Sequence, residues 1–259
     1  MTEAGEQKVA LITGVGRRRS IGAALAIGLA RDGWDLALNY WTPYDDRVGL
    51  ERIGNDPRAV ADLCRSLGAS VKLIEGDLSD TAAPAAIVDQ ARALGPLAGL
   101  VMSHAESVDS SILTTDLDSW DRHFAVNARA TWLLIKAFAE QLPLKSEPGT
   151  PRASVVALTS DHTIDNLPYG ASKGALDRIV TAAAVELKDR GVRANVINPG
   201  PIDTGWMDDK TRAWCTEATP AGRLGTAEDT TNLVRFLFSP AGAWINGQVL
   251  SSNGGFKFG

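Results

Sequence analysis

The chain has few of the features that would indicate a special compartment or a metal centre. Its 259 residues include two cysteines, Cys64 and Cys215, which lie too far apart in sequence to form a metal-binding motif. We therefore expect neither a disulfide framework nor a metal site, and we predict a reducing, cytoplasmic setting. No apolar run approaches the length of a membrane span, and the polar start at residues 1–6 is not typical of a secretory signal.

An excess of positive charge is also absent. The formal net charge is −5, whereas a general nucleic-acid binder normally carries a basic surface. Hydrophobic residues make up 44% of the chain, which is enough for a full core, and no internal repeat or clear linker divides it. We therefore expect one domain over residues 1–259, with neither nucleic acid nor membrane as a partner.

Short apolar runs typical of β-strands alternate with helical stretches along the chain. Most of these runs are continuously apolar, as in parallel strands that are buried on both faces. The alternation predicts right-handed βαβ units in a single doubly wound α/β domain of Rossmann type, with a mostly parallel seven-stranded sheet and helices on both faces. The expected strands are Val9–Thr13, Leu36–Tyr40, Val71–Glu75, Gly99–Ser103, Ser154–Thr159, Arg193–Ile197 and Gln248–Ser251. The expected helices are Ile21–Arg31, Ala59–Leu67, Ala85–Leu94, Trp120–Gln141, Tyr169–Asp189 and Glu228–Phe238, and Lys145–Arg152 is expected to be a loop.

The first expected strand runs into a glycine-rich turn. Gly14 and Gly16 lie in this turn, and Ser20 and Ile21 stand where an alanine-rich helix begins. Glycines here permit a tight turn and a close approach of the backbone to a pyrophosphate at the helix N-terminus. The segment therefore predicts a dinucleotide-binding turn, although a glycine-bearing turn without a ligand would have the same sequence.

The choice of dinucleotide depends on the next strand. That strand ends near Asn39 without the carboxylate that commonly binds an unphosphorylated ribose. Three arginines, Arg17, Arg18 and Arg19, lie in the turn instead, where a guanidinium can bind a 2′-phosphate through two hydrogen bonds. NADP(H) is therefore favoured over NAD(H).

Two alternatives stay open at this end of the site. The arginines could form a solvated loop, and Asp45 or Asp46 could approach the ribose. Asp77, followed by Leu78, comes directly after the third strand and is placed to accept a hydrogen bond from an adenine amine. It could equally cap the next helix.

Tyr169 and Lys173 are the strongest catalytic candidates. Their spacing of four residues puts both side chains on one helical face. A lysine ammonium beside a phenol favours the phenolate, so we expect the pKa of Tyr169 to be lowered. Such a phenol can act as a general acid or base at a carbonyl or carbinol oxygen.

Together with further landmarks, these residues make the chain similar to a known family. Asn127 lies in Phe124–Arg129, Asn198–Thr204 follows a strand, and the closing segments are Gly222–Asp229 and Asn246–Leu250. In this order, and over essentially its whole length, the chain resembles the short-chain dehydrogenase/reductase family, particularly its ketoacyl-reductase-like members. The resemblance implies hydride transfer between a nicotinamide and a small-molecule carbonyl or secondary alcohol carbon.

The resemblance also implies roles for individual residues. Tyr169 would be the general acid in reduction, Lys173 would assist it and bind the nicotinamide ribose, and Ser160 would polarise the carbonyl. Asn127 would hold a water for proton transfer, or would brace backbone groups instead. Family members commonly form tetramers, and the apolar end Phe256–Phe258 fits such an interface, so a homotetramer is predicted. The expected cofactor-binding residues are Gly14, Gly16, Arg17, Arg18, Arg19, Ser20, Ile21, Asn39, Asp77, Leu78, Ser103, His104, Tyr169, Lys173, Pro199, Gly200, Ile202 and Thr204.

The sequence departs from the family pattern in the turn and after the fourth strand. The turn is two residues longer than the commonest form and has Ser20 in place of its middle glycine, as in the enoyl-reductase branch. That branch separates its tyrosine and lysine by seven residues, so carbonyl reduction is favoured. Ser103 and His104 stand where the family usually has two asparagines; they could reach the cofactor ribose, or His104 could be a structural histidine bonded to backbone.

A third departure concerns the substrate side. Ser160 lies nine residues before Tyr169, four fewer than usual, so Thr159 could take its role. The substrate lid is expected near residues 203–220, where Trp206–Glu217 contains two tryptophans that either meet an apolar or ring-shaped substrate or turn inward. The alternatives to a carbonyl reductase are a 3-ketoacyl or enoyl thioester reductase and a non-catalytic dinucleotide-sensing module.

Overall fold

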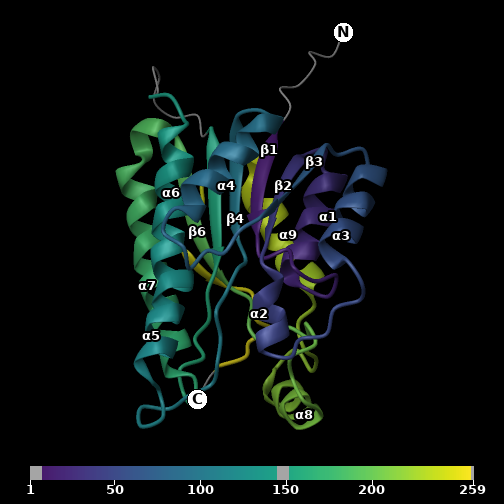
Figure 1. Ribbon diagram of the computed structural model, residues 1–259, viewed down its shortest axis with the longest axis vertical. Coiled ribbons are helices and arrows are strands. Elements are labelled where there is room, and N and C mark those ends of the chain that lie inside the picture. The colour runs from purple at the N-terminus through teal and green to yellow at the C-terminus, as the bar shows by residue number, and fades with distance from the viewer. Residues whose placement is uncertain (1–7, 145–151, 258–259) are drawn as a thin grey trace.

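A seven-stranded sheet forms the centre of the molecule (Figure 1). The computed structural model describes residues 8–144 and 152–257, so most of the expected loop Lys145–Arg152 and the terminal Phe258 lie outside it. The strand order is β3-β2-β1-β4-β5-β6-β7, and every neighbouring pair is parallel. The predicted doubly wound α/β fold is confirmed, with a sheet that is entirely rather than mostly parallel. The strands are β1 (Val9–Thr13), β2 (Asp35–Tyr40), β3 (Val71–Glu75), β4 (Leu97–Met102), β5 (Ala153–Leu158), β6 (Val192–Asn198) and β7 (Val249–Ser251).

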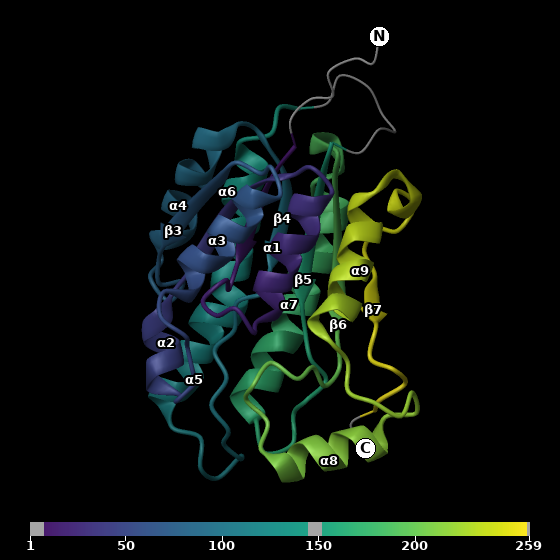
Figure 2. The same ribbon diagram turned by 90° about the vertical axis from the view of Figure 1, so that its right-hand side faces the viewer.

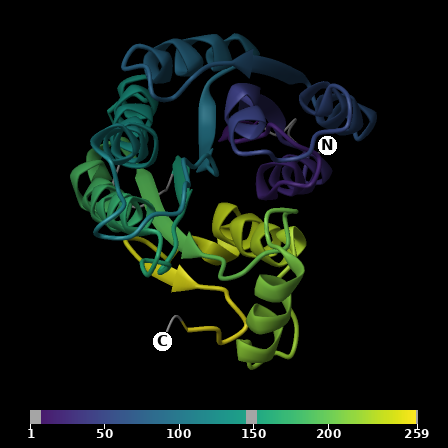
Figure 3. The same cartoon turned by 60° about the horizontal axis from the view of Figure 1, so that its bottom comes forward.

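Helices cover both faces of this sheet, as Figures 2 and 3 show. On one face, Leu134 and Val180 belong to the same buried cluster as Leu100 of β4. On the other face, Leu25 and Val234 pack with Ile12 of β1. The continuous apolar runs are needed in β1, β2, β4, β5 and β6 because each of these strands contributes buried side chains to both clusters. The helices are α1 (Ile21–Arg31), α2 (Thr42–Arg47), α3 (Asp56–Ser66), α4 (Ala83–Ala91), α5 (Leu117–His123), α6 (Ala130–Glu140), α7 (Leu167–Glu186), α8 (Asp209–Ala218) and α9 (Ala227–Phe238).

Two helical regions differ from the prediction. The helix expected over Trp120–Gln141 is α5 and α6 joined by a π-helical segment, Phe124–Arg129. Helix α2 was not predicted, because its six residues are mostly polar, begin with Thr-Pro and are too few to show an apolar period. Within the described ranges, none of the helices is both long enough and apolar enough to cross a bilayer.

The carboxyl ends of the strands meet at one edge of the sheet, at the bottom of Figure 1, where α2 and α8 also lie. Strand order reverses at β1, which pairs with β2 on one side and with β4 on the other. Crevices outside such a switch point are where open α/β sheets bind ligands. The functional site is therefore expected at this edge.

Candidate active site

Two cavities open at the carboxyl edge of the sheet. The first, of about 460 Å³, is lined by the glycine-rich turn, the ends of β2, β3 and β4, and the start of α7. The second, of about 770 Å³, lies between residues 159–162 and the substrate lid (residues 203–220). Both volumes fall within the range of about 300–1,000 Å³ that is usual for ligand sites. The residues that line both cavities are Ile21, Thr159, Tyr169, Pro199, Thr204 and Trp206.

The glycine-rich turn is shaped by contacts that leave no room for side chains. Gly14 has a φ of +79°, and a Cβ there would lie 2.7 Å from the backbone of Ser103 and His104. A Cβ on Gly22 would lie 2.6 Å from the carbonyl oxygen of Gly14, so α1 packs tightly on the turn. Ser20 is the N-cap of α1, and its Oγ accepts from the Ala23 N–H at 3.0 Å. The turn therefore presents the N-terminus of α1 to the first cavity.

The three arginines of the turn have three different carboxylate partners. Arg17 Nε lies 3.2 Å from Asp45, and Arg17 lines the first cavity. Arg18 pairs with Asp56, and Arg19 pairs with Asp203. The structure does not bring Arg18 or Arg19 to the first cavity, because their partners hold them on its outside.

Asn39, Asp77 and Leu78, which follow or end β2 and β3, also line the first cavity. The Asn39 amide donates to the carbonyl oxygens of Ile74 and Gly76, which fixes the ends of β2 and β3 to each other. Asp77 Oδ1 accepts from the Ser79 N–H at 2.8 Å and thus stabilises a local turn. Asp77 does not cap the next helix, since Ala82 is the N-cap of α4.

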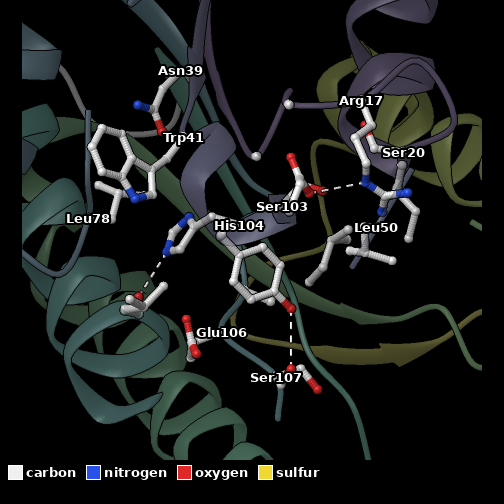
Figure 4. A pocket seen from close by; sticks show the side chains of 18 of the residues that line it. Arg17, Ser20, Asn39, Trp41, Leu50, Leu78, Ser103, His104, Glu106 and Ser107 are labelled. Atoms are coloured by element: carbon white, nitrogen blue, oxygen red, sulfur yellow. Dashed lines mark hydrogen bonds and ion pairs between the residues drawn. The ribbon is translucent and has the colours of Figure 1, made fainter. Parts of the chain in front are cut away.

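Sequence analysis missed the contribution of α2 to this cavity. Trp41, Tyr44 and Arg47 line it, and Figure 4 shows Trp41 between Asn39 and Leu78. The signal that could have found them is the aromatic residue at the tip of β2, directly before the Thr-Pro start of a helix.

Helix α2 is attached to the segment that follows β4. The Tyr44 hydroxyl donates to the Ser107 carbonyl oxygen at 3.3 Å. Arg47 Nη2 lies 2.7 and 2.6 Å from the two carboxylate oxygens of Glu106, whose side chain is buried. These contacts join α2, which follows β2, to the segment that follows β4.

His104 is a neutral structural residue at the base of the first cavity. Its Nε2 lies 3.0 Å from the Val126 carbonyl oxygen and must donate to it, so Nδ1 accepts from the Thr13 hydroxyl at 2.6 Å. Burial and the nearby Lys173 lower the pKa of His104 to about 3. Of the two alternatives for His104, these contacts favour the structural one, while its neighbour Ser103 lines the cavity.

Asn127 is buried in the π-helical segment and does not line either cavity. Its Oδ1 accepts from the Glu106 N–H at 2.8 Å. Its Nδ2 donates to the Glu106 carbonyl oxygen and to the Ser172 hydroxyl, both at 2.9 Å. The side chain thus braces the segment after β4 against α7, which is the bracing alternative stated above.

Tyr169 and Lys173 lie on one face of α7, as their spacing predicted. Lys173 Nζ is 5.7 Å from the centre of the Tyr169 ring and donates to the Leu158 carbonyl oxygen at 2.9 Å. The expected lowering of the Tyr169 pKa is wrong: burial raises the pKa to about 12, and a hydrogen bond with Ser160 opposes that rise only in part. Burial likewise lowers the pKa of Lys173 to about 8. Desolvation is therefore the largest cause of the pKa shift in both groups.

The short loop after β5 still delivers Ser160 to Tyr169. A Cβ on Gly170 would lie 2.6 Å from the His162 carbonyl oxygen, so this glycine lets the loop lie directly on α7. Thr159 instead points to α7, where its hydroxyl bonds the Asp177 carboxylate. Ser160 rather than Thr159 is therefore the hydroxyl that contacts the phenol.

The second cavity begins where the loop after β6 leaves the sheet. Pro199, Gly200, Ile202 and Thr204 all line it, and Gly200 has a φ of +66° that allows the turn. Helix α8 of the substrate lid also lines it. The lining side chains from the lid are Trp206, Met207, Asp208, Lys210, Thr211, Trp214 and Cys215.

The first cavity fits a nicotinamide dinucleotide. The glycine-rich turn and the N-terminus of α1 offer backbone N–H groups for a pyrophosphate. Asn39 and Asp77 line the cavity beside β2 and β3, and Tyr169 and Lys173 line it from α7. The turn has no room for side chains at Gly14, which is the backbone requirement of such a site.

Comparison with known proteins supports this assignment of the fold. The sequence model of a family described as Enoyl-(Acyl carrier protein) reductase matches residues 14–257. An uncharacterised oxidoreductase, YjdA, from Bacillus subtilis (strain 168) is 32% identical over 256 residues, covering 97% of each chain.

Two solved structures are similar over nearly the whole chain. A blue fluorescent protein from a metagenomic library, in complex with NADPH, is 28% identical with a TM-score of 0.82, covering 97% of this chain and 98% of that one. A short-chain dehydrogenase/reductase from Serratia marcescens BCRC 10948 is 27% identical with a TM-score of 0.83, covering 96% of this chain and 97% of that one.

Proposed function

The chain belongs to the short-chain dehydrogenase/reductase family and is an oxidoreductase, and on that premise we propose that it reduces a small-molecule carbonyl with NADP(H), with Tyr169 as the general acid. One observation carries the proposal. Tyr169 lies in the wall between the two cavities, with Lys173 on the side of the first and Ser160 on the side of the second. A proton donor is thus placed where a dinucleotide and a substrate would meet.

The side chains suit proton transfer to a carbonyl oxygen. A bound nicotinamide would supply the hydride to the carbonyl carbon. With a pKa raised to about 12, Tyr169 stays protonated at neutral pH and can donate its proton to the oxygen as negative charge develops there. Ser160 contacts the phenol, and its single O–H can turn from the phenol to donate a hydrogen bond to the same carbonyl oxygen.

Lys173 would assist from the other side of the phenol. Its ammonium donates one hydrogen bond to the Leu158 carbonyl oxygen, so two further N–H donors can bind a ribose hydroxyl. Because its pKa of about 8 is close to neutral pH, Lys173 can also take part in returning a proton to Tyr169.

NADP(H) is the proposed cofactor. Arg17 lines the first cavity, whereas no carboxylate stands at the tip of β2, where Asn39 is found. The bound NADPH in the metagenomic blue fluorescent protein supports the same choice.

The walls of the second cavity favour a neutral, apolar or aromatic carbonyl compound. Trp206 and Trp214 are 47% and 50% exposed, and Trp214 meets Phe256 edge-on at 5.7 Å. Three carboxylates but one lysine line the cavity, which disfavours a strongly anionic substrate. The lining carboxylates are Asp109, Asp161 and Asp208.

An enoyl thioester reductase is the second candidate function. The description of the matching family model favours it, as does the lengthened turn that ends in Ser20. The interval of four residues between Tyr169 and Lys173 favours carbonyl reduction instead.

A substrate panel tests the proposal and separates the two candidates. Aromatic ketones, quinones, 3-ketoacyl thioesters and enoyl thioesters would each be incubated with NADPH and, in parallel, with NADH. We expect oxidation of NADPH with a ketone or quinone and at least tenfold slower turnover with NADH. Turnover of enoyl thioesters alone would move the assignment to the second candidate. Cofactor binding without any turnover would contradict both and favour a dinucleotide sensor.

We also propose that the protein is a homotetramer in a reducing, cytoplasmic setting. Large apolar side chains are exposed on two separate parts of the surface: Leu117 and Trp132 near α5 and α6, and Trp244 after α9. Trp244 is 98% exposed, a position that a subunit contact would cover. Both cysteines are free and buried, which supports the reducing setting. Light scattering that gives the mass of a monomer would contradict the tetramer.

A further inference from the structure

A buried ion pair lies inside the first cavity and takes no part in the proposed chemistry. Arg17 Nε is 3.2 Å from Asp45 Oδ1, and the two side chains are only 10% and 8% exposed. Arg17 Nη1 also donates to the Thr204 carbonyl oxygen at 2.8 Å. The guanidinium therefore joins α2 to the loop after β6, directly beside the glycine-rich turn.

The Asp45 carboxylate touches the turn itself. Its Oδ2 lies 2.8 Å from the place where a Cβ on Gly16 would be. The missing side chain of Gly16 thus leaves a space that a carboxylate of this same chain fills. A phosphate is also an anion with several oxygen acceptors, and a guanidinium can bind it through two parallel hydrogen bonds.

We propose that Asp45 is a placeholder for a phosphate of the cofactor, which displaces its carboxylate from Arg17 on binding. This inference rests on the proposed use of a nicotinamide dinucleotide. It makes Asp45 a residue that sets cofactor affinity, because each binding event must break the ion pair. Both the pyrophosphate and the 2′-phosphate of NADP(H) have the required chemistry.

The displacement would also loosen α2. Besides Asp45, the contacts that hold α2 across the cavity are the hydrogen bond of Tyr44 to Ser107 and the ion pair of Arg47 with Glu106. The contact with Arg17 is the one on the side of the glycine-rich turn. Its loss would let the α2 end of the cavity open while the cofactor phosphate takes over the guanidinium.

The test compares two variants with the same change in charge. Asp45→Asn removes the placeholder, while Asp46→Asn removes a neighbouring carboxylate that is 63% exposed and pairs with Arg52 instead. Dissociation constants for ADP-ribose and 2′-phospho-ADP-ribose would be measured by calorimetry, so no turnover is needed. We expect Asp45→Asn to bind at least one of these ligands about tenfold more tightly, since one unit of charge competition is removed, and Asp46→Asn to bind like the wild type.

The ligand whose affinity increases in Asp45→Asn shows which phosphate of the cofactor Arg17 binds. A gain for 2′-phospho-ADP-ribose alone assigns the 2′-phosphate to Arg17, and an equal gain for both ligands assigns the pyrophosphate. No gain for either ligand, or the same gain in Asp46→Asn, would overturn the placeholder while leaving the proposed function intact. Failure of every variant and of the wild type to bind either ligand would remove the proposed function, and this inference with it.

A variant at Arg17 keeps the proposal testable if Asp45→Asn does not fold. Arg17→Gln should weaken binding of the same ligand at least tenfold, because the phosphate loses its guanidinium. Asp45→Asn should gain much less affinity in the Arg17→Gln background than in the wild type, since Asp45 competes chiefly for Arg17. Unchanged affinity in Arg17→Gln would refute the proposal.

Discussion

Cationic side chains are held differently in two parts of the first cavity, the glycine-rich turn and the start of α7. At the glycine-rich turn, Arg17, Arg18 and Arg19 each lie within ion-pair distance of a carboxylate. At the start of α7, Lys173 is even more buried than Arg17 but is held by a backbone carbonyl, and none of the ion pairs between described residues includes it.

The difference separates binding from chemistry. A paired guanidinium keeps its charge, so it can hold an anion but cannot exchange a proton. Burial lowers the pKa of Lys173 toward neutral pH, because no carboxylate among the described residues lies within ion-pair distance and the charge of Asp177 opposes the shift only in part. We expect variants at the α7 end to change rate and variants at the turn to change affinity.

Replacing the proposed acid should have the largest effect. Tyr169→Phe removes the proton donor, so we expect kcat to fall by about 1,000-fold. Cofactor affinity, measured by calorimetry, should stay within a few-fold of the wild type, because the ring remains in place. Tyr40→Phe, which removes a phenol bonded to Glu75 outside both cavities, serves as the control and should keep full activity. A folded Tyr169→Phe protein with wild-type kcat would refute the mechanism.

Lys173→Met should separate rate from stability. We expect kcat to fall by about 100-fold, since the ammonium that assists Tyr169 is lost. The pKa of Lys173 is about 8 in the folded chain, against 10.5 for an ordinary lysine. The unfolded chain therefore binds the proton more tightly than the folded chain does. Below pH 8, where Lys173 is charged in both states, burial of this charge lowers the free energy of unfolding. The wild type should therefore gain stability as pH rises from 8 to 10.5.

Denaturant unfolding of Lys173→Met at pH 7 tests whether the buried charge of Lys173 lowers the stability of the protein. Removing the charge should leave the free energy of unfolding unchanged or raise it, by at most about 3 kcal/mol. Lys136→Met, at an exposed lysine beside Glu140, provides the control for losing a lysine. A marked loss of stability in Lys173→Met would show that the ammonium is a structural tie rather than a group kept for chemistry.

A variant at His104 tests whether this imidazole is uncharged in the folded protein, as its hydrogen bonds indicate. Its pKa is lowered to about 3, so between pH 6.5 and 3 the unfolded chain binds a proton that the folded chain does not, and stability falls as pH falls. Between pH 7 and pH 5, His104 should lower the free energy of unfolding of the wild type by about 2 kcal/mol, and His104→Asn should not show this loss. Equal losses in both proteins, measured by denaturant unfolding at the two pH values, would contradict a neutral His104.

The smallest expected effect distinguishes the two hydroxyls after β5. Ser160→Ala should lower kcat at least about tenfold, because a hydrogen-bond donor to the developing oxyanion is lost. Thr159→Ala should leave kcat nearly unchanged and reduce stability instead, since Thr159 bonds Asp177 on α7. If neither variant slows turnover, the assignment of a carbonyl-polarising hydroxyl to this loop is wrong.

The sheet could be predicted from sequence because each buried strand is a continuous apolar run. The bounds of β1, β3 and α1 agree with the structure to the residue. Helix α2 could not be predicted, since its position depends on side-chain contacts with Ser107 and Glu106, more than fifty residues away.

The sequence predicted which residues lie in the candidate site better than it predicted their pKa values and their ion-pair partners. The spacing of Tyr169 and Lys173 placed both on one face, but the direction of the Tyr169 pKa depends on burial, which no local pattern reports. The partners of the arginines were equally hidden, because Asp45, Asp56 and Asp203 come from three separate segments.

The widened turn at Phe124–Arg129 bears on how this chain tolerates changes of length. A π-helical turn takes up one residue more than an α-helical turn, so the helices on either side keep their phase. Deleting one residue there should leave α5 and α6 in register with the core while turning Asn127 away from Glu106 and Ser172. A relative that is one residue shorter at this point would therefore keep the fold but lose the hydrogen bonds by which Asn127 connects Glu106 to Ser172 of α7. The deletion of one codon would be enough to cause this loss.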